Sequence, residues 1–262
     1  GCHVFMGSRS MEKGAEAVKS IEAEEPKAKD KIQVVQLDVQ SAESVSAAAA
    51  KVKDALGGEP KLYGLVNNAG AGLAHGVEAK SIIDTNLYGC KRVGDAFVPL
   101  LSPNLGRVVN VGSGIGPGWM SRAAPDVRAT LCDPKVAWEQ IDQIAQADIA
   151  NGGSGENAAR GEAFNAYGLS KATLMAYTHT LVRQHPTLTC STISPGFINT
   201  AMTKGFNARL TPEQGTVSIR HCLFETLAGN GWMFGSDAKR SPLDASREPS
   251  DPEYTDPTGR GW

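Results

Sequence analysis

Tyr167-Gly168-Leu169-Ser170-Lys171 is the stretch around which the rest of this chain can be interpreted. Its tyrosine and lysine are four positions apart, and on a helix this spacing places both side chains on one face. The apolar positions from Ala172 to Val182 continue a helical pattern without proline or glycine, which predicts that the stretch lies on a helix. An ammonium group beside a phenol favours the phenolate, so the pair is a candidate for proton transfer. Alone, the pattern more often marks a surface tyrosine and a solvated lysine, so the rest of the chain must decide.

The composition is that of one soluble α/β domain. The chain has 262 residues, of which 41% are apolar and 21% charged. A net charge of −2 gives no electrostatic footprint for nucleic acid, and no apolar run approaches the roughly 20 residues that cross a bilayer. We therefore expect neither a nucleic-acid partner nor a membrane partner.

The cysteine and histidine residues indicate neither a disulfide framework nor a metal site. The five cysteines are scattered, odd in number and contain no C-x-x-C pair, and the five histidines have no ligand-like spacing. We expect reduced thiols, a cytoplasmic location and no metal. The chain starts at Gly1 and enters an apolar strand within two residues, so we interpret it as a fragment whose N-terminus is missing, which leaves a targeting peptide open.

Apolar strands and helices alternate along most of the chain. The expected strands cover 3–6, 32–37, 62–66, 107–111 and 187–193, and the expected helices between them include 11–23, 42–56 and 79–101. Strands that alternate with helices of this length predict βα units and a parallel sheet covered on both faces. We therefore predict an α/β fold with a doubly wound, Rossmann-type sheet in a single domain.

Polar residues follow several of the expected strands at the point where each strand ends. Asp38 follows one strand, Asn67-Asn68 the next, Ser113 another and Pro195-Gly196 the last. In an open parallel sheet, ligands bind outside the carboxyl ends of the strands. Each of these residues alone is equally compatible with a helix cap, a turn or a small loop residue. Together, in this order, they predict a shared site.

These motifs give the chain a clear resemblance to a known family. Asn67-Asn68-Ala69-Gly70, Asn86, Ser113, the tyrosine–lysine stretch and Pro195-Gly196 match, in order, the motifs of the short-chain dehydrogenase/reductase family. Within it the chain resembles the monomeric NADPH-dependent carbonyl reductases. One reason is that the number of sequence positions between Ser113 and Tyr167 is far larger than in most members of the family. The other is the presence of the stretches 211–215 and 234–237. The resemblance covers roughly Val4 to Leu243. It implies a Rossmann-type domain over 1–243, a helical insert at about 114–166 and an irregular tail over 244–262.

The resemblance also implies a role for each matching residue. Tyr167 would be the general acid, Ser113 would hold the substrate oxygen, and Lys171 would favour the tyrosinate and bind the nicotinamide ribose. Asn86 would sit in a helix kink and hold a water that links Lys171 to solvent. The cofactor-binding residues that the resemblance implies are Arg9, Asp38, Val39, Asn67, Asn68, Ala69, Gly70, Tyr167, Lys171, Pro195, Gly196, Ile198 and Thr200.

The residue that follows the first strand bears on the choice of cofactor. An acidic side chain there would accept from the ribose 2′-hydroxyl and repel a 2′-phosphate. This chain has Ser8-Arg9, and a guanidinium suits a phosphate. We therefore expect NADPH.

The insert contains one recognisable amphipathic helix. Asp133 is a good N-cap, Pro134 a good first helical residue, and apolar positions mark one face as far as Ile149. The resemblance implies that this helix covers a surface where relatives form dimers or tetramers, which would leave a monomer; the alternative is a lid over the active site. Phe197, Met202 and Phe206 are candidates for the substrate pocket. Trp119 and Met120 either line the pocket or belong to the core.

The family's first strand and its T-G-x-x-x-G-x-G turn are missing from the sequence. That strand is central in the usual order, and the helix after it holds the pyrophosphate. We therefore expect strands 3–6 and 32–37 to lose their link to the sheet, and this chain to bind NADPH poorly and fold with little stability.

The leading hypothesis is an oxidoreductase that reduces a ketone, aldehyde or quinone with NADPH. The alternatives are a catalytically silent NADP(H)-binding regulatory protein and the reverse reaction on a secondary alcohol. The presence of Asn86, Ser113, Tyr167 and Lys171 favours an enzyme, because a cofactor sensor needs no acid and no proton relay.

Overall fold

A computed structural model describes residues 1–72, 77–151, 162–257 and 259. The N-terminal part contains two strands, each followed by a helix. Its elements are β1 (Val4–Ser8), α1 (Met11–Glu24), a 3₁₀ turn (Pro26–Ala28), β2 (Ile32–Gln36) and α2 (Ala42–Ala55). Ser41 caps α2 by accepting a hydrogen bond from the backbone N–H of Ser44, as its sequence position predicts.

The middle of the chain carries the helix predicted over 79–101, but it is not uniform. The elements are β3 (Gly64–Asn67), α3 (Ala79–Ile83), a π-helical turn (Asp84–Gly89), α4 (Cys90–Phe97), a 3₁₀ turn (Val98–Leu100) and β4 (Arg107–Val111). The π turn contains Asn86, at the place where the resemblance implies a helix kink. Such turns are rare and often lie at functional sites.

The remaining elements form the insert, the long helix and the C-terminal part. They are α5 (Ile115–Met120), α6 (Pro125–Leu131), α7 (Trp138–Ala150), α8 (Glu162–Gln184), β5 (Thr189–Ile193), two 3₁₀ turns (Ala201–Thr203 and Gln214–Thr216), α9 (Val217–Phe224), β6 (Met233–Phe234) and β7 (Arg240–Ser241). Gly168 and Lys171 lie on α8, as predicted.

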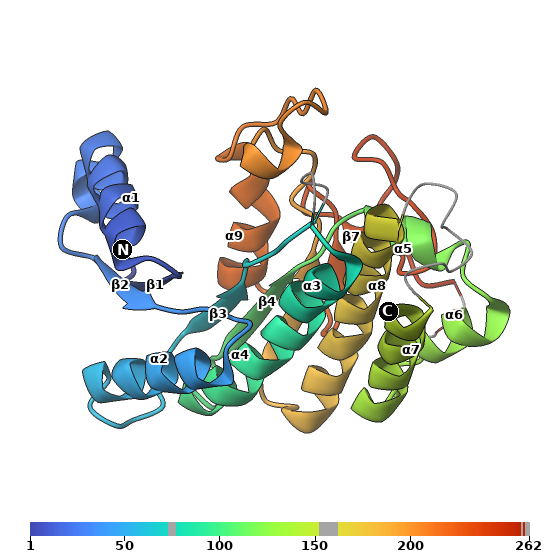
Figure 1. Cartoon of the computed structure of the whole chain (residues 1–262), viewed down its shortest axis with the longest axis horizontal. Helices are drawn as coiled ribbons and strands as arrows, with labels where there is room; N and C mark the ends of the chain where they lie inside the picture. The colour runs from blue at the N-terminus through green and yellow to red at the C-terminus, as the bar shows by residue number, and fades with distance from the viewer. Residues whose placement is uncertain (73–76, 152–161, 258, 260–262) are drawn as a thin grey trace.

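The strands form two separate sheets. One has the order β3-β4-β5-β6-β7, parallel apart from the antiparallel β6–β7 pair, and the other contains only β1 and β2, also parallel. β1, β2 and α1 form one end of the molecule, shown in blue in Figure 1. The expectation that the two N-terminal strands lose their link to the sheet is confirmed.

A cavity lies between these two sheets. It has a volume of about 560 Å³ and is lined by both β1 and β3, with Phe5, Val35, Leu65 and Phe97 among its apolar residues. Neither β1 nor β3 has a second strand partner among the described residues. The free edges of β1 and β3 therefore border the same, mainly apolar cavity.

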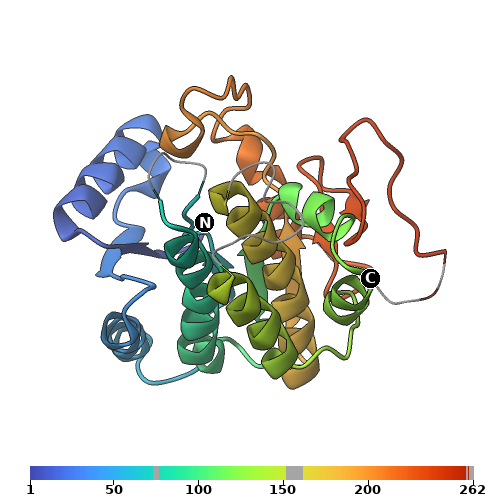
Figure 2. The ribbon, with the colours of Figure 1, turned by 45° about the vertical axis from the view of Figure 1, so that its right-hand side comes forward.

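Helices cover both faces of the larger sheet. Val108 of β4 packs in one apolar cluster with α4 and α8, whereas the next residue, Val109, packs in another cluster with Cys222 of α9. This follows because successive side chains of a strand point to opposite faces. Figures 1 and 2 both show α4, α8 and α7 side by side on one face. The predicted doubly wound fold is confirmed.

The start of the insert helix was predicted wrongly. Residues from Asp133 to Val136 form a turn, and α7 begins at Trp138, where the backbone N–H of Ala137 donates to Gln140 Oε1 at 2.9 Å. The reason is a tertiary contact that the local pattern does not contain. Arg183 of α8 donates to the carbonyl oxygens of Pro134 (3.2 Å) and Val136 (2.8 Å), so these carbonyls are used outside a helix.

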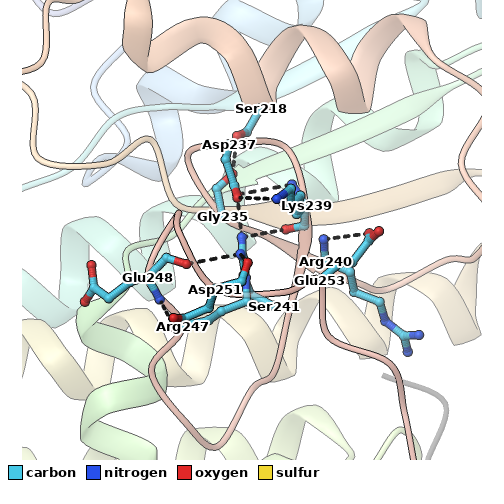
Figure 3. A network of polar contacts seen from close by, with 10 residues as sticks. All are labelled: Ser218, Gly235, Asp237, Lys239, Arg240, Ser241, Arg247, Glu248, Asp251 and Glu253. Atoms are coloured by element: carbon cyan, nitrogen blue, oxygen red, sulfur yellow. Dashed lines mark hydrogen bonds and ion pairs between the residues drawn. The ribbon is translucent and has the colours of Figure 1, made fainter.

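The last described stretch, 244–257, contains neither helix nor strand, but it is anchored. The guanidinium of Arg247 pairs with Asp237 and donates to Ser241 Oγ (3.0 Å) and the carbonyl oxygens of Glu248 (3.1 Å) and Asp251 (3.0 Å), as Figure 3 shows. The Arg247 side chain is only 5% exposed. One side chain therefore holds the tail against the turn between β6 and β7.

Candidate active site

Tyr167 and Lys171 lie together on α8, close to the end of β4. Both side chains are buried, and Lys171 Nζ is 5.7 Å from the centroid of the Tyr167 ring. Nζ also donates to the carbonyl oxygen of Val111, the last residue of β4, at 2.8 Å. The lysine is therefore fixed beside both the phenol and the carboxyl end of a central strand. This excludes the interpretation of a surface tyrosine and a solvated lysine.

Asn86 joins the π turn to two other elements of the site. Its side chain is fully buried, and its Oδ1 accepts from the backbone N–H of Ala71 at 2.7 Å. Its Nδ2 donates to the carbonyl oxygen of Ala71 (2.8 Å) and to Ser170 Oγ (2.9 Å). Asn86 thus ties the loop after β3 to the helix that carries Tyr167.

The loop after β3 passes directly over these side chains. A Cβ atom at Gly70 would lie 3.8 Å from Lys171 Nζ and 3.5 Å from Asn86 Oδ1, and one at Gly72 would lie 2.2 Å from a ring carbon of Tyr167. Gly72 also has a φ of +135°. Glycine is therefore required at 72, where the backbone lies against the Tyr167 ring, whereas a Cβ atom at Gly70 would make only ordinary contacts.

Ser113 begins the turn into α5 at the end of β4. It is half-buried, and its Oγ accepts from the backbone N–H of Ile115 at 3.3 Å. A Cβ atom at Gly116 would lie 3.1 Å from the carbonyl carbon of Lys171, so α5 packs against the turn of α8 that carries the lysine. Ser113 and the Tyr167–Lys171 pair are therefore brought to the same end of the sheet.

A residue that the sequence reading did not single out supports the Ser113 loop. Ser194 Oγ accepts from the backbone N–H of Gly114 at 3.0 Å. Ser194 follows β5, so the loops after β4 and β5 are joined. The only signal in the sequence was its place directly before Pro195-Gly196.

The cofactor-binding residues predicted near β1 and β2 lie on the smaller sheet and beside α4. Arg9 is exposed directly after β1. The Oδ1 atom of Asp38 accepts a hydrogen bond from the backbone N–H of Gln40 at 3.0 Å. Val39 packs against Gly89, since a Cβ atom at Gly89 would lie 2.8 Å from a methyl carbon of Val39. Val39 therefore lies against the π turn that contains Asn86, whereas Arg9 follows the edge of the smaller sheet.

Asn67, Asn68 and Ala69 follow β3, and the three differ in their surroundings. Asn68 and Ala69 are exposed, whereas the buried Asn67 donates through Nδ2 to Asn110 Oδ1 at 2.8 Å. Asn110 Nδ2 in turn donates to Thr178 Oγ1 (2.9 Å) on α8. The side chain of Asn67 thus belongs to a buried polar ladder between β3, β4 and α8 that the sequence reading did not foresee.

The predicted residues after β5 lie in the loop that follows this strand. Pro195 and Gly196 are half-buried, and Gly196 has a φ of +85°, which favours glycine. Ile198 pairs with Leu210 through an isolated bridge, and Thr200 lies directly before the 3₁₀ turn Ala201–Thr203.

Of the candidate pocket residues, those in the insert belong to the core. Met120 is fully buried and Trp119 is 8% exposed. Phe197 and Phe206 are exposed, and Met202 is half-buried. The segment after β5 therefore exposes apolar side chains, whereas Trp119 and Met120 of α5 are buried in the core.

Cys90 is a buried thiol that lies within the electrostatic reach of Lys171. Burial raises the pKa of the Cys90 thiol to about 11, an effect that the Lys171 charge partly offsets, so this thiol is neutral at physiological pH. In the part of the chain that the structure describes there is no group of three histidine, cysteine or acidic side chains that could hold a metal, and no helix long and apolar enough to cross a membrane.

The residues present fit one end of a dinucleotide better than the other. An ammonium has three donor protons, and among the described residues Lys171 Nζ uses one, toward Val111. Gly70 of the loop after β3 lies next to this ammonium, since a Cβ atom there would be 3.8 Å from Nζ. A pyrophosphate needs backbone N–H groups at a helix N-terminus, and the sequence lacks the glycine-rich turn that would provide them.

Comparison with known proteins identifies the family. Residues 1–124 match the family model described as short chain dehydrogenase. (+)-Neomenthol dehydrogenase of Arabidopsis thaliana is 30% identical over 231 residues, which cover 77% of this chain and 76% of that protein. The chain belongs to the short-chain dehydrogenase family. It is therefore an oxidoreductase by family, and the family binds a nicotinamide cofactor.

Two further short-chain dehydrogenase relatives match almost the whole chain. Short-chain dehydrogenase/reductase 1 of Saponaria officinalis is 29% identical over 276 residues, covering 93% of this chain and 89% of the relative. The structure of salutaridine reductase from Papaver somniferum has a TM-score of 0.73 and 25% identity, with 88% of this chain and 90% of that chain covered. The likeness thus includes the insert and the C-terminal part.

Proposed function

We propose that this chain is an NADPH-dependent carbonyl reductase that converts a ketone, aldehyde or quinone to an alcohol. The observation that supports this most is the arrangement of Tyr167 and Lys171, both buried and 5.7 Å apart from ring centroid to Nζ, beside the loop that bears Ser113. The relatives named dehydrogenases and reductases are consistent with either direction of one reaction.

In this proposal Tyr167 donates the proton that the carbonyl oxygen gains. When bound, the reduced nicotinamide supplies the hydride that adds to the carbonyl carbon. Lys171 lies close enough to stabilise the tyrosinate that remains, because an opposite charge at short range in a dry site interacts strongly. Ser113 Oγ donates to the substrate oxygen while negative charge develops on it. A proton from solvent then restores the phenol, and we assign its delivery to Lys171 with Asn86.

Arg9 supports the choice of NADPH over NADH. Its exposed guanidinium follows β1, where a 2′-phosphate would meet it. A charge-assisted hydrogen bond is worth about 1.5–3 kcal/mol, so Arg9→Ala should weaken NADPH binding by roughly 10- to 100-fold. NADH binding, measured by the same fluorescence titration, is the internal control and should change little.

The proposal also includes the oligomeric state and the location. The apolar face of α7, with Ile141 and Ala145 buried, packs on α8 and α3. A second copy would need that face of α8, so we propose a monomer, in the cytoplasm. Size-exclusion chromatography with light scattering at micromolar concentration tests the first point.

Tyr167→Phe is the decisive test of the proposed chemistry. The variant should bind NADPH as the unchanged chain does and lose carbonyl reduction by a factor of at least about 100, the usual contribution of a general acid. Tyr177→Phe is the matched control, since Tyr177 lies on the same helix, is buried and has a hydroxyl without a hydrogen-bond partner among the described residues. Undiminished turnover in Tyr167→Phe would remove the central role of this tyrosine.

Two other functions are separated by simple measurements. A silent NADP(H)-binding protein would bind the cofactor and oxidise it with no member of a carbonyl panel. The reverse reaction would show as NADP⁺ reduction with secondary alcohols. The intact set of Asn86, Ser113, Tyr167 and Lys171 supports an enzyme, and the panel also narrows the substrate class.

A further inference from the structure

The side chain of Asn165 links three helices directly beside the proposed general acid. Asn165 lies two residues before Tyr167 on α8 and is fully buried. Its Oδ1 accepts from Trp119 Nε1 on α5 at 2.9 Å, and its Nδ2 donates to Asp148 Oδ1 on α7 at 3.0 Å. One amide therefore connects the catalytic helix to both neighbouring helices of the insert.

Trp119 contacts α8 on both sides of Tyr167 in the sequence. Its indole N–H meets Asn165, and its ring lies against Gly168, where a Cβ atom would come within 2.8 Å of Trp119 Cδ1. Any larger residue at 168 would push the ring away. Because α5 begins at Ile115, two residues after Ser113, the position of Trp119 against α8 also affects how the Ser113 loop meets the tyrosine.

Trp119 and Asp148 together fix the direction of these hydrogen bonds. An ionised carboxylate only accepts and an indole N–H only donates, whereas an amide can be turned either way. With Asp148 on one side, Asn165 must direct its NH₂ group to the carboxylate and its oxygen to Trp119. Without an acceptor at 148 the indole N–H would still select the amide oxygen, but the NH₂ group would lose the carboxylate that holds it toward α7.

The position of Asp148 is unfavourable for an ionised carboxylate. Its Oδ2 is buried and has no hydrogen-bond partner among the described residues. Burial raises the pKa of Asp148, and the hydrogen bond from Asn165 opposes that rise. A buried carboxylate with one unpaired oxygen contributes little to stability. We therefore look for the role of Asp148 in how it holds Asn165.

We infer that Asp148, in the insert, is a positioning residue for Tyr167: it orients the Asn165 amide so that Trp119 fixes the Ser113 helix against the tyrosine helix. The assignment rests on the proposed carbonyl reduction for its consequence in catalysis. It gives the insert a second part in the enzyme besides covering a face of α8. A displacement of about 1 Å in the reacting groups costs up to about 100-fold in rate.

The chain contains a matched control on the same helix. Asp142 also lies on α7 and also ties it to the body of the protein, since Tyr88 Oη donates to Asp142 Oδ1 at 2.6 Å. That contact reaches the π turn and not the start of α8. Asp142→Ala therefore removes a comparable anchor of α7 without touching Asn165.

The experiment compares Asp148→Ala, Asp148→Asn and Asp142→Ala in steady-state kinetics and thermal unfolding. Asp148→Ala should lower kcat by roughly 10-fold or more with the KM for NADPH within about twofold of the unchanged chain. Asp148→Asn keeps an acceptor oxygen and should recover most of the rate, while Asp142→Ala should keep kcat and lose a similar amount of stability. An equal loss of kcat in the two alanine variants, or no loss in either, would overturn the assignment.

Hydrogen exchange of the Trp119 indole, followed by NMR on tryptophan-labelled protein and assigned with Trp119→Phe, tests the link without reference to activity. The indole N–H should exchange faster in Asp148→Ala than in Asp148→Asn or Asp142→Ala, and equal exchange in all three would refute the link. If the unchanged chain reduces no carbonyl, the proposed function fails on its own, and the exchange data still decide whether Asp148 holds Asn165.

Discussion

The Asn86 amide and the Ser170 hydroxyl lie 2.9 Å apart although 84 positions separate them in the chain. Ser170 Oγ in turn donates to the carbonyl oxygen of Tyr167 at 2.8 Å. The serine within the tyrosine–lysine stretch thus connects the π turn to the turn of helix that carries the proposed acid.

We predict that Ser170→Ala destabilises the protein by about 1–3 kcal/mol, because the buried Asn86 amide loses a partner, and that it lowers kcat. Thr180→Val is the control, since the buried Thr180 hydroxyl makes the same bond to the carbonyl three residues earlier, at 2.8 Å, and no hydrogen bond to a side chain among the described residues. Urea unfolding and steady-state kinetics measure both effects. Equal losses in the two variants would contradict a special role for Ser170.

Gly72→Ala should abolish most activity. The new methyl group would overlap the Tyr167 ring, and the φ of +135° is strained for alanine. Gly58→Ala separates these two causes, because Gly58 has a φ of +84° and nothing within 4 Å of its Cβ position. We expect Gly58→Ala to cost about 1–2 kcal/mol of stability with kcat unchanged, and Gly72→Ala to lower kcat by more than about 100-fold. Activity retained in Gly72→Ala would show that the ring can move without consequence.

The sequence predicted the parts of the structure that depend on local spacing and on the order of the motifs. Lys171 was expected beside its tyrosine because of their helical spacing, and the family resemblance implied that Asn86 lies in a kink. The separation of β1 and β2 followed from the missing glycine-rich strand. These features depend on local patterns and on the general geometry of parallel sheets.

The parts that depend on tertiary packing could not be predicted. The Asp148–Asn165–Trp119 link joins three helices whose relative positions no local pattern gives, and Arg183 moved the start of α7 by binding carbonyls at the expected cap. The strand β6 has two residues, too short for any period. Asn67 was predicted to meet the cofactor, and its bond to Asn110 depends on the register of β3 against β4.

His179 should make folding sensitive to mild acid. It is 5% exposed, its Nε2 has no partner among the described residues, and burial lowers its pKa from 6.5 to about 4. Between these values the unfolded chain binds a proton that the folded chain does not, so the stability is present above about pH 6.5 and is lost as the pH falls toward 4.

From pH 6.5 to 5 the loss should reach about 2 kcal/mol. His179→Phe should flatten this slope in urea unfolding at the two pH values, and His3→Gln, at an exposed position, should leave it unchanged. An unchanged slope in His179→Phe would show that other groups carry the acid sensitivity.

Arg247→Ala should release the C-terminal tail and cost about 3–5 kcal/mol, the usual effect of removing one partner from a buried ion pair. Arg247→Lys should recover little, because an ammonium cannot satisfy the separate acceptors that the guanidinium fork reaches in Figure 3. Thermal unfolding and limited proteolysis of the tail measure these effects, with the exposed Arg220→Ala as the control. A tail that stays protected in Arg247→Ala would assign the anchoring to other contacts.

The cavity between β1 and β3 should accept one more parallel strand. Adjacent strands are about 4.8 Å apart, both strand edges are unpaired among the described residues, and the lining is mainly apolar. A parallel strand needs a crossover of a dozen or more residues, so the test is an extension ahead of Gly1 with a five-residue apolar strand, a glycine-rich turn and a helix. Each buried aliphatic side chain contributes about 1.5–3 kcal/mol before ordering costs, and a net gain of 2–3 kcal/mol would raise Tm by about 5–10 °C.

The same extension should tighten NADPH binding, because its helix N-terminus would offer the backbone N–H groups that a pyrophosphate needs. An extension of equal length with the strand replaced by glycine and serine controls for mere length, and one with an intact strand but no glycine-rich turn separates stability from binding. Thermal unfolding and NADPH fluorescence titration measure the two gains. If the unextended chain already binds NADPH and unfolds as the extended one does, the open strand edges are no defect, and the cofactor is held by the residues around Lys171 alone.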